Sequence, residues 1–409
     1  MVSKESLNSR AGITAKTLFI LVFLIANTFA WYSYAFSVLL EIIANTKLAY
    51  SETLTVWIIH FGGVAISALV GAIASNKIHR IHLILLWMLF GLFSSLLPIP
   101  AGFENVLGVS VISLCWAISF GLGMPACMGY FTEFTTTENR GRYGGITFFA
   151  IGASMFLLGM INVYGFTAEI LTLTAWKGLG LIVLAFLKES NEHERISKVP
   201  SYSSILHERS FLLYITAWIM FCLVNYTNFP IMENFFGQEF VYLSSLIEGI
   251  ISGIFALFSG LLCDMVGRKR LIISGFVMLG IGYATLGVFP GTLISWYFYT
   301  IVDGIAWGMF GTIFIIILWG DLSYGMPSEK YYAIGGLPLL FANFLQLAAG
   351  PYLVRFISVS AAFSLASFFL FLAVLPLLYA PETLPEKKIK ERELKGYIEK
   401  AKKIKEKLV

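Results

Sequence analysis

The chain contains twelve apolar runs, and each is long enough to cross a lipid bilayer as a helix. About 20 residues, with a rise of about 1.5 Å each, span the hydrocarbon core. Backbone N–H and C=O groups in lipid must be satisfied within the protein, and a helix achieves this within one segment. We therefore predict an all-α polytopic membrane protein with twelve transmembrane helices. The runs are 17–44, 53–75, 81–99, 105–130, 143–163, 168–187, 211–232, 240–263, 271–290, 294–320, 332–354 and 357–379.

The composition excludes a soluble protein. Of 409 residues, 58% are hydrophobic and 13% are charged, whereas about a quarter of an average soluble domain is charged. Such a chain cannot cover a water-facing surface, so a soluble enzyme, a nucleic-acid-binding protein and a secreted disulfide scaffold are excluded. The formal net charge of +4 lies in the tail from Pro381 onward, and it gives no reason to expect a nucleic-acid partner.

Neither a metal site nor an enzyme is expected. The four cysteines lie in apolar runs, with no Cys-x-x-Cys pair and no Cys/His cluster, so we predict no disulfide, no metal and no cofactor. The sequence also has no HExxH motif, no Ser/His/Asp grouping and no nucleotide-binding loop. The cysteines are Cys115, Cys127, Cys222 and Cys263.

Lys and Arg are distributed unevenly between the two sets of loops. If the N-terminus is inside, only Lys47 and Arg355 of the 28 Lys and Arg residues lie outside, and Lys177 lies within the membrane. Basic residues are enriched in the cytoplasmic loops of membrane proteins. We therefore expect an integral protein of the cytoplasmic (plasma) membrane with both termini in the cytoplasm.

The longest inner loop divides the twelve runs into two sets of six. Small residues recur every four positions in the second run, at Gly63, Ser67 and Gly71, and similarly in the eighth, where Gly260 ends the pattern. This weak repeat predicts two six-helix bundles, a plan in which transporters bind substrate between the halves near the midplane. The predicted divisions are a cytoplasmic N-terminus 1–16, a first bundle 17–187, a central cytoplasmic loop 188–210, a second bundle 211–380 and a basic cytoplasmic tail helix 381–409.

The loop after the eighth run resembles a signature of the major facilitator superfamily. It reads GLLCDMVGRK, and it matches the family's loop motif with Gly260, Asp264, Gly267 and Arg268. The expected first copy, GAIASNKIHR from Gly71 onward, is degraded, because a serine stands where the motif has its acid.

Two further motifs resemble the sugar-porter branch of this superfamily. Glu133 followed by Arg140 and Gly141 is similar to the signature between helices four and five, and the segment 381–383 (Pro-Glu-Thr) is similar to the terminal motif. The Trp-Tyr pair beginning at Trp31 looks like a segment of metabolite–proton symporters. The glutamine-rich sugar-binding motif is absent from the seventh run, so sugar is a less favoured substrate.

The resemblance implies a transporter whose halves close and reopen at their cytoplasmic ends. An acid such as Asp264 could stabilise a neighbouring helix N-terminus or pair with Arg268 or Lys330. The alternative is an ordinary basic inner loop that follows the charge rule for membrane proteins. The residues assigned to this gate are Gly71, Glu133, Arg140, Gly141, Gly260, Asp264, Gly267 and Arg268.

Four ionisable residues lie inside the predicted spans, where charge is costly. His60, Lys177, Glu248 and Asp303 are each eight or nine residues from the outer end of their run, so they could share a layer about 12–14 Å deep. The family plan implies that the tenth helix lines the cavity, which makes Asp303 the first candidate for a substrate or proton site. Glu248 either carries the proton or bonds to a neighbouring helix. Lys177 is expected to pair with an acid or to extend to the surface.

Aromatic and amide side chains follow the same helical faces. Aromatic walls with sparse amides suit a small, partly apolar organic molecule, although aromatic residues at helical spacing more often serve packing. For His60 the alternative is a satisfied buried histidine. The complete substrate and proton set is Asp303, Glu248, Trp307, Tyr299, Asn225, Trp218, Trp31, Asn27 and His60.

We therefore expect a secondary active transporter that moves a small organic solute by alternating access, with proton-coupled symport. A carboxyl group in a dry cavity can bind and release a proton as its surroundings change, and linkage then couples the two fluxes. The expected partners are the solute, H+ and the lipid bilayer, and the expected state is a monomer. A passive facilitator of the same fold and a non-transporting membrane sensor stay open as alternatives.

Overall fold

The fold is described from a computed structural model, which describes residues 4–101, 105–161, 165–187 and 199–384. These residues form helices joined by short turns, and they contain no strand. Eleven helices are long and apolar enough to cross a membrane. The shorter apolar helix α3 completes the twelve predicted spans.

The helices of the first half run from α1 to α8, and those of the second half from α10 to α17. The first set is α1 (Lys4–Thr46), α2 (Tyr50–Ala74), α3 (Arg80–Leu96), α4 (Pro98–Ala101), α5 (Val106–Gly121), α6 (Met124–Glu133), α7 (Arg140–Gly159) and α8 (Phe166–Leu184). The short α9 (Tyr202–Leu206) lies in the central loop. The second set is α10 (Arg209–Phe236), α11 (Gln238–Val266), α12 (Arg268–Val288), α13 (Leu293–Phe310), the π-helix η1 (Gly311–Ile317), α14 (Leu318–Leu322), α15 (Glu329–Phe356), α16 (Val359–Leu372) and α17 (Val374–Tyr379).

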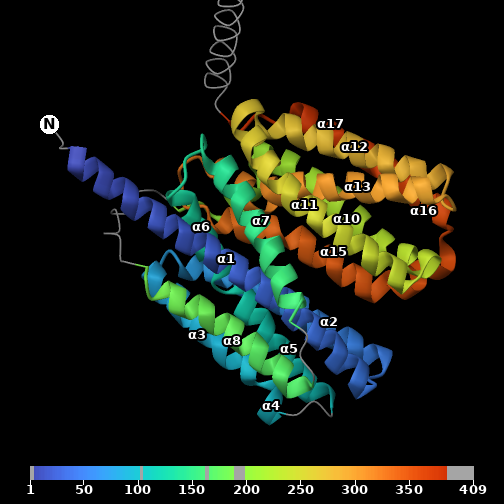
Figure 1. Cartoon of the computed structure of the whole chain (residues 1–409), viewed down its shortest axis with the longest axis horizontal. Helices are drawn as coiled ribbons and strands as arrows, with labels where there is room; N and C mark the ends of the chain where they lie inside the picture. Colours follow the sequence, from blue (N-terminus) through green and yellow to red (C-terminus); the bar gives the residue numbers. More distant parts are fainter. Residues whose placement is uncertain (1–3, 102–104, 162–164, 188–198, 385–409) are drawn as a thin grey trace, which may run out of the picture.

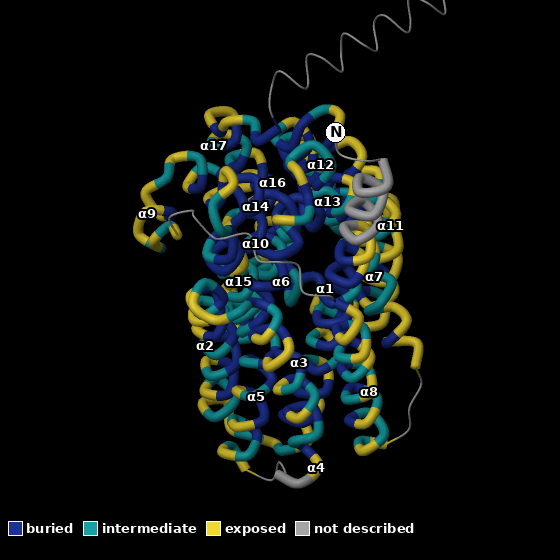
Figure 2. Tube along the Cα trace, turned by 90° about the vertical axis from the view of Figure 1, so that its left-hand side faces the viewer, coloured by how far each residue is buried: buried dark blue, intermediate teal, exposed yellow. Residues whose placement is uncertain are grey.

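The two halves form separate bundles that lie side by side. Figure 1 shows the blue-to-green helices of the first half below the yellow-to-red helices of the second half, with α7 running beside α11. Buried residues follow the axes of both bundles in Figure 2, and exposed residues follow their outer faces. Most of the predicted tail helix 381–409 and part of the central loop 188–210 lie outside the described residues.

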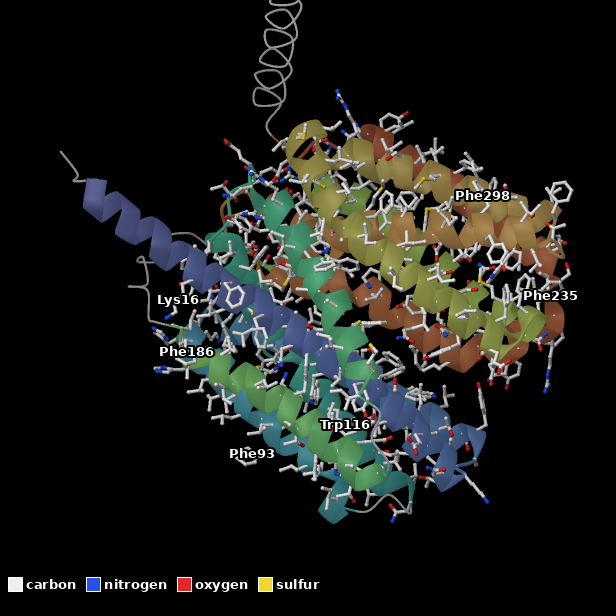
Figure 3. The ribbon with its side chains drawn as sticks, viewed as in Figure 1. Lys16, Phe93, Trp116, Phe186, Phe235 and Phe298 are labelled. Carbon is white, nitrogen blue, oxygen red and sulfur yellow. The ribbon has the colours of Figure 1, made fainter. Side chains whose placement is uncertain are left out.

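Apolar side chains cover the outer faces of the bundles. Phe93, Phe235 and Phe298 project away from the helices in Figure 3 and are 66%, 44% and 41% exposed. Trp116, by contrast, is fully buried inside the first bundle. A surface of large exposed apolar residues around helices of this length is that of an integral membrane protein, because lipid is the solvent that such a surface favours.

The predicted fourth helix, 105–130, is not continuous. It breaks at Leu122 and Gly123, and α6 then continues to Glu133. Pro125 lacks the N–H that would continue the ladder of α5, and the Trp87 ring lies 2.1 Å from the point that a Cβ on Gly123 would occupy. The break therefore has a local cause, which is the proline, and a tertiary cause, which is the Trp87 indole in the space that a side chain at residue 123 would occupy.

The halves approach each other most closely where α7 meets α11. A Cβ built on Gly145 would lie 2.4 Å from the carbonyl oxygen of Ala256, and a Cβ on Gly260 would lie 2.5 Å from that of Gly141. Small residues in the eighth run, which the sequence pattern singled out, therefore let two backbones touch across the boundary between the halves.

Candidate functional site

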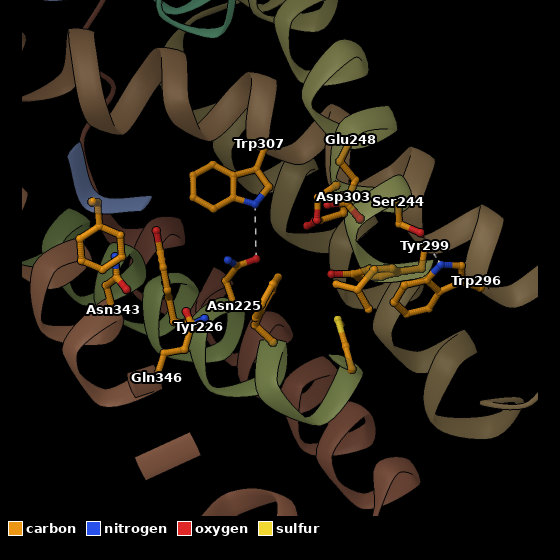
Figure 4. A pocket seen from close by; sticks show the side chains of 15 residues that line it. Asn225, Tyr226, Ser244, Glu248, Trp296, Tyr299, Asp303, Trp307, Asn343 and Gln346 are labelled. Carbon is orange, nitrogen blue, oxygen red and sulfur yellow. Dashed lines mark hydrogen bonds between the residues drawn. The ribbon is translucent and has the colours of Figure 1, made fainter. Parts of the chain in front are cut away.

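A cavity of 330 Å³ lies almost entirely within the second half of the molecule (Figure 4). Its walls come from α10, α11, α13 and α15, and Phe36 of α1 is the one described contribution from the first half. The lining residues are Phe36, Asn225, Tyr226, Phe229, Met232, Val241, Ser244, Ser245, Glu248, Trp296, Tyr299, Asp303, Trp307, Asn343 and Gln346.

Helix α13 supplies an aromatic wall of the cavity that carries one carboxyl group. Trp296, Tyr299, Asp303 and Trp307 follow at spacings of three and four, so they lie on one face, and all four line the cavity. The Trp296 indole nitrogen donates to the Ser244 hydroxyl at 2.8 Å. This hydrogen bond holds the aromatic face of α13 against α11.

Two carboxyl groups meet in this cavity. Figure 4 shows Glu248 of α11 beside Asp303 of α13. The two helices can approach because Gly304 has no side chain: a Cβ there would lie 2.8 Å from Ile251 and 3.0 Å from the Glu248 carbonyl oxygen. Asp303 is 2% exposed, and its Oδ1 has no hydrogen-bond partner among the described residues.

Amide side chains occupy the opposite wall. The Trp307 indole nitrogen donates to Asn225 Oδ1 at 3.3 Å, the bond that Figure 4 marks with a dashed line. Asn343 and Gln346 of α15 face the same space, and the sequence analysis did not assign them. Two amides three residues apart within an apolar run were the signal that could have identified them.

Four residues that the sequence analysis assigned to the site lie elsewhere. Trp218 donates to the Gly335 carbonyl oxygen at 3.0 Å and lines a second, apolar cavity of about 100 Å³. Asn27, Trp31 and His60 belong to the interior of the first bundle. These four residues do not line the cavity with Asp303, because each side chain lies on a face of its helix that packs against other parts of the protein.

Hydrogen bonds within the first bundle account for two of these side chains. His60 Nε2 lies 3.0 Å from the Tyr32 hydroxyl, and His60 Nδ1 lies 3.2 Å from the Ser113 hydroxyl, which agrees with the alternative of a satisfied buried histidine. The Trp31 indole donates to Ser95 Oγ at 2.8 Å.

The expectation for Lys177 is wrong. Its side chain is fully buried and forms no ion pair with any acid in the described part of the chain. The ammonium instead lies 4.8 Å from the ring centroids of both Trp31 and Trp87 and donates to Thr28 Oγ1 at 3.2 Å. Two cation–π contacts replace the predicted acid, because indole faces carry the partial negative charge that an ammonium requires.

Buried ion pairs join the halves at the end of the molecule opposite the cavity. Arg80 pairs with Glu133 at 2.6 Å and also with Glu329 of the second half. Arg140 pairs with Asp321 across the same boundary. Arg80 is the last residue of the degraded first motif, which begins at Gly71. The loop that carries this motif therefore still contacts the second half, although the motif lacks its acidic residue.

Around Asp321 the network continues through Arg268 and Asp264 and returns to the first half at α7. Arg268 lies 3.0 Å from Asp321 and 3.5 Å from Asp264. Asp264 accepts hydrogen bonds of 2.9 Å from the backbone N–H groups of Gly141 and Arg142, so it caps the N-terminus of α7. Of the contacts considered for Asp264, the helix terminus and Arg268 are therefore present.

Lys330, the other partner considered for Asp264, bonds elsewhere. Its ammonium donates to the Pro200 carbonyl oxygen at 2.8 Å and lies 5.1 Å from the centroid of the Tyr202 ring. The Tyr202 hydroxyl donates to the Leu69 carbonyl oxygen at 2.6 Å. Burial raises the pKa of Tyr202 to about 12, so it stays a donor at physiological pH and ties the central loop to both halves.

The terminal Pro-Glu-Thr motif caps another helix of this network. Glu382 accepts hydrogen bonds from the backbone N–H groups of Arg268 at 2.8 Å and Lys269 at 3.1 Å. Gly267 has φ +102°, a conformation that favours glycine, and a Cβ there would lie 2.4 Å from Glu382 Oε2. Gly267 therefore allows Glu382 to reach the N-terminus of α12.

The molecule thus has three layers along its helices. The cavity with the carboxyl pair lies toward Gly237, where α10 meets α11. An apolar layer around Trp218 lies between this cavity and the ion pairs, and it includes Phe120 and Met128 of the first half. The ion pairs form the third layer. On the far side of the cavity, the halves also touch where the Tyr50 hydroxyl donates to the Ala348 carbonyl oxygen at 2.6 Å.

Comparisons with known proteins agree with this architecture. No curated protein matches the sequence. Among solved structures, the proton:xylose symporter XylE bound to 6-bromo-6-deoxy-D-glucose is similar, with a TM-score of 0.72 and 17% identity over 91% of this chain and 97% of that one. A double-tryptophan mutant of XylE has a TM-score of 0.67 and 17% identity, with coverage of 94% and 99%.

A third similar structure is the human organic anion transporter MFSD10, with a TM-score of 0.63 and 14% identity over 90% of this chain and 99% of that one. At these identities the likeness shows the fold alone. The family model described as Major Facilitator Superfamily matches residues 18–337, which is most of the chain. On this match and on the twelve-helix, two-bundle fold, the chain belongs to the major facilitator superfamily.

Proposed function

We propose that the protein is a secondary transporter that carries a small organic solute across the plasma membrane by alternating access, with proton symport. The observation that carries the proposal is the pair of carboxyl groups, Glu248 and Asp303, in a cavity on the far side of the ion pairs. The proposal includes cytoplasmic termini and a monomer as the working unit.

Proton coupling is argued from the surroundings of the carboxyl pair. Burial disfavours the charged form of a carboxyl group, and a neighbouring carboxylate disfavours it further. Such a pair binds a proton when water is excluded and releases it when water enters. A solute bound beside Asp303 changes that balance, and by reciprocity the proton changes the affinity for the solute.

Alternating access is argued from the cytoplasmic ion pairs. Arg80–Glu329 and Arg140–Asp321 both cross between the halves, so opening this end requires both to separate. Removing one partner of a buried pair leaves the other charge uncompensated, which costs about 3–5 kcal/mol, so the closed state requires both partners of each pair. Release of solute on this side then depends on the energy gained when the other end closes around it.

The test uses purified protein in liposomes that contain a pH-sensitive dye. Sugars, carboxylates, amino acids and amines are added outside, and we expect one class to acidify the lumen as it enters. Asp303→Asn, which removes the titrating group and keeps its shape, should abolish the acidification. Glu41→Gln, which changes an exposed acid outside the cavity, is the matched control and should transport normally.

Three outcomes would contradict the proposal. Uptake of a solute with no movement of protons would identify a passive facilitator of the same fold. Acidification that persists in Asp303→Asn would exclude this residue as the site of coupling. A lumen that becomes more alkaline would replace symport with exchange.

A further inference from the structure

The cavity that contains Glu248 and Asp303 carries charged side chains of one sign only among the described residues that line it. Glu248 and Asp303 are its acids, and none of the described residues that line it is a Lys, Arg or His. A bound anion would face two carboxyl groups with no compensating cation, and like charges this close repel strongly in a medium of low dielectric constant. The electrostatics of the wall therefore favour a ligand that is itself positive.

An unpartnered polar atom also points to a ligand. Oδ1 of Asp303 lacks a hydrogen bond among the described residues, although the side chain is 2% exposed. Buried carboxylate oxygens are rarely left without a donor, because the unsatisfied atom costs free energy. A ligand with an N–H group in the cavity would donate the missing hydrogen bond, and a cationic centre without an N–H would offset the charge of the carboxylate.

Aromatic rings surround the same space. Trp296, Tyr299 and Trp307 line it from α13, and Tyr226 and Phe229 line it from α10. The faces of such rings attract cations, and the attraction increases when water is excluded. The first bundle shows that this chain holds an ammonium in that way, because Lys177 lies between two indoles at 4.8 Å from each centroid.

We propose that the cavity binds a small organic cation, an amine or a quaternary ammonium compound. Its charged nitrogen lies against the Glu248–Asp303 pair and the indoles of α13, and its remaining polar groups contact the amides of Asn343 and Gln346. The inference rests on the proposed function, since it names the substrate class of the same site.

The charge balance agrees with symport. Two carboxylates can hold one proton and one organic cation, which leaves the loaded cavity neutral. The titratable groups that face the pair from the surrounding helices are Tyr226 of α10, Tyr283 of α12 and Tyr299 of α13. The Tyr299 hydroxyl donates to that of Tyr283 at 3.2 Å. No basic group competes with the ligand for the carboxylates among the described residues that line the cavity.

Binding of benzyltrimethylammonium to the purified full chain tests the inference by calorimetry. Benzyl alcohol and benzoate serve as neutral and anionic probes of similar shape. We expect saturable binding of the ammonium probe and none of benzoate. Glu248→Gln should weaken binding about tenfold or more, because it removes a charge from the pair.

Three further variants test the aromatic contact and provide a control. Trp307→Leu should weaken binding about threefold or more through loss of the cation–π contact, and Trp307→Phe should restore part of it. Glu41→Gln should bind as the unchanged protein does. Thermal unfolding of each variant shows whether it is folded, and Trp307→Phe keeps the test decisive if Glu248→Gln does not fold.

The inference is overturned if the ammonium probe does not bind, if benzoate binds as tightly, or if Glu248→Gln binds the cation normally. These results differ from failure of the proposed function. Proton influx driven by a sugar or a carboxylate, with no ammonium binding, would keep proton symport and remove the cation. Ammonium binding without any proton movement in liposomes would keep the cation and remove proton coupling.

Discussion

The polar side chains of the cavity wall differ in burial, because Asp303 is buried whereas Glu248, Asn343 and Gln346 are half-buried. Asp303 and Glu248 were predictable because ionisable groups in an apolar span are costly and seldom accidental. Asn343 and Gln346 were not predicted, because burying an amide costs less free energy than burying a charged group, so an amide in an apolar run is a weaker sign of function. All four line one cavity, so the amides are the natural contacts for the uncharged part of a solute.

At these amides we predict a loss of affinity without loss of proton coupling. Gln346→Leu should weaken solute binding about twofold to tenfold, because a typical hydrogen bond contributes about 0.5–1.5 kcal/mol. Titration of solute-driven acidification in liposomes gives the apparent affinity. Phe341→Leu, on the exposed face of the same helix, is the control, and an equal effect in both variants would contradict the role of Gln346.

Lys177 allows a second prediction at the scale of one side chain. Because it fills the space between Trp31 and Trp87, Lys177→Ala should leave a void and destabilise the protein by about 2–4 kcal/mol. Lys177→Met keeps most of the volume and should cost clearly less. Thermal unfolding in detergent compares the two, and equal losses would mean that the charge, rather than the packing, stabilises this layer.

At the scale of helices, the contact between α7 and α11 depends on glycines, which have no side chain to separate the two backbones. Gly145→Val should destabilise the closed arrangement by about 1–3 kcal/mol, because a Cβ there would lie 2.4 Å from the Ala256 carbonyl oxygen and such overpacking strains the backbone. Gly152→Ala on the same helix has nothing within 4 Å of the added carbon, so it should be neutral or slightly stabilising.

Thermal unfolding and solute uptake measure the effect of these glycine variants. If Gly145→Val and Gly152→Ala behave alike, the close approach of the two helices is not required for function. The small-residue spacing in the sequence indicated an internal repeat. It did not identify the partner helix, because the same spacing serves contacts within a bundle, as at Gly71, where a Cβ would lie 1.8 Å from the Leu122 carbonyl oxygen.

At the scale of the whole molecule, the Arg80–Glu329 pair connects the two halves. Glu329→Gln leaves the buried Arg80 with only the half-exposed Glu133 as its ion-pair partner. The change should therefore favour opening of this end, by less than the about 3–5 kcal/mol that an entirely unpaired buried charge costs. The double variant Arg80→Gln with Glu329→Gln should cost less than the sum of the single changes.

Labelling of Met128→Cys in an otherwise cysteine-free protein reports this opening. Met128 lines the apolar layer between the cavity and the ion pairs, so a water-soluble thiol reagent reaches it only when the end that carries the ion pairs opens. We expect faster labelling in Glu329→Gln. Unchanged labelling would show that the Arg140–Asp321 pair holds this end closed without Arg80.

The sequence by itself determined twelve helices, two sets of six, the uneven distribution of basic residues between the two sets of loops, and which ionisable residues lie inside the apolar runs. These properties depend on run length and composition, which are linear along the chain. Only the tertiary structure decided that Asp303 and Glu248 share a cavity, while His60 and Lys177, predicted at the same depth, are held by contacts inside the first bundle. The physical reason is that lipid is as apolar as a protein interior, so apolar periodicity cannot distinguish a face that lines a cavity from one that packs or meets lipid.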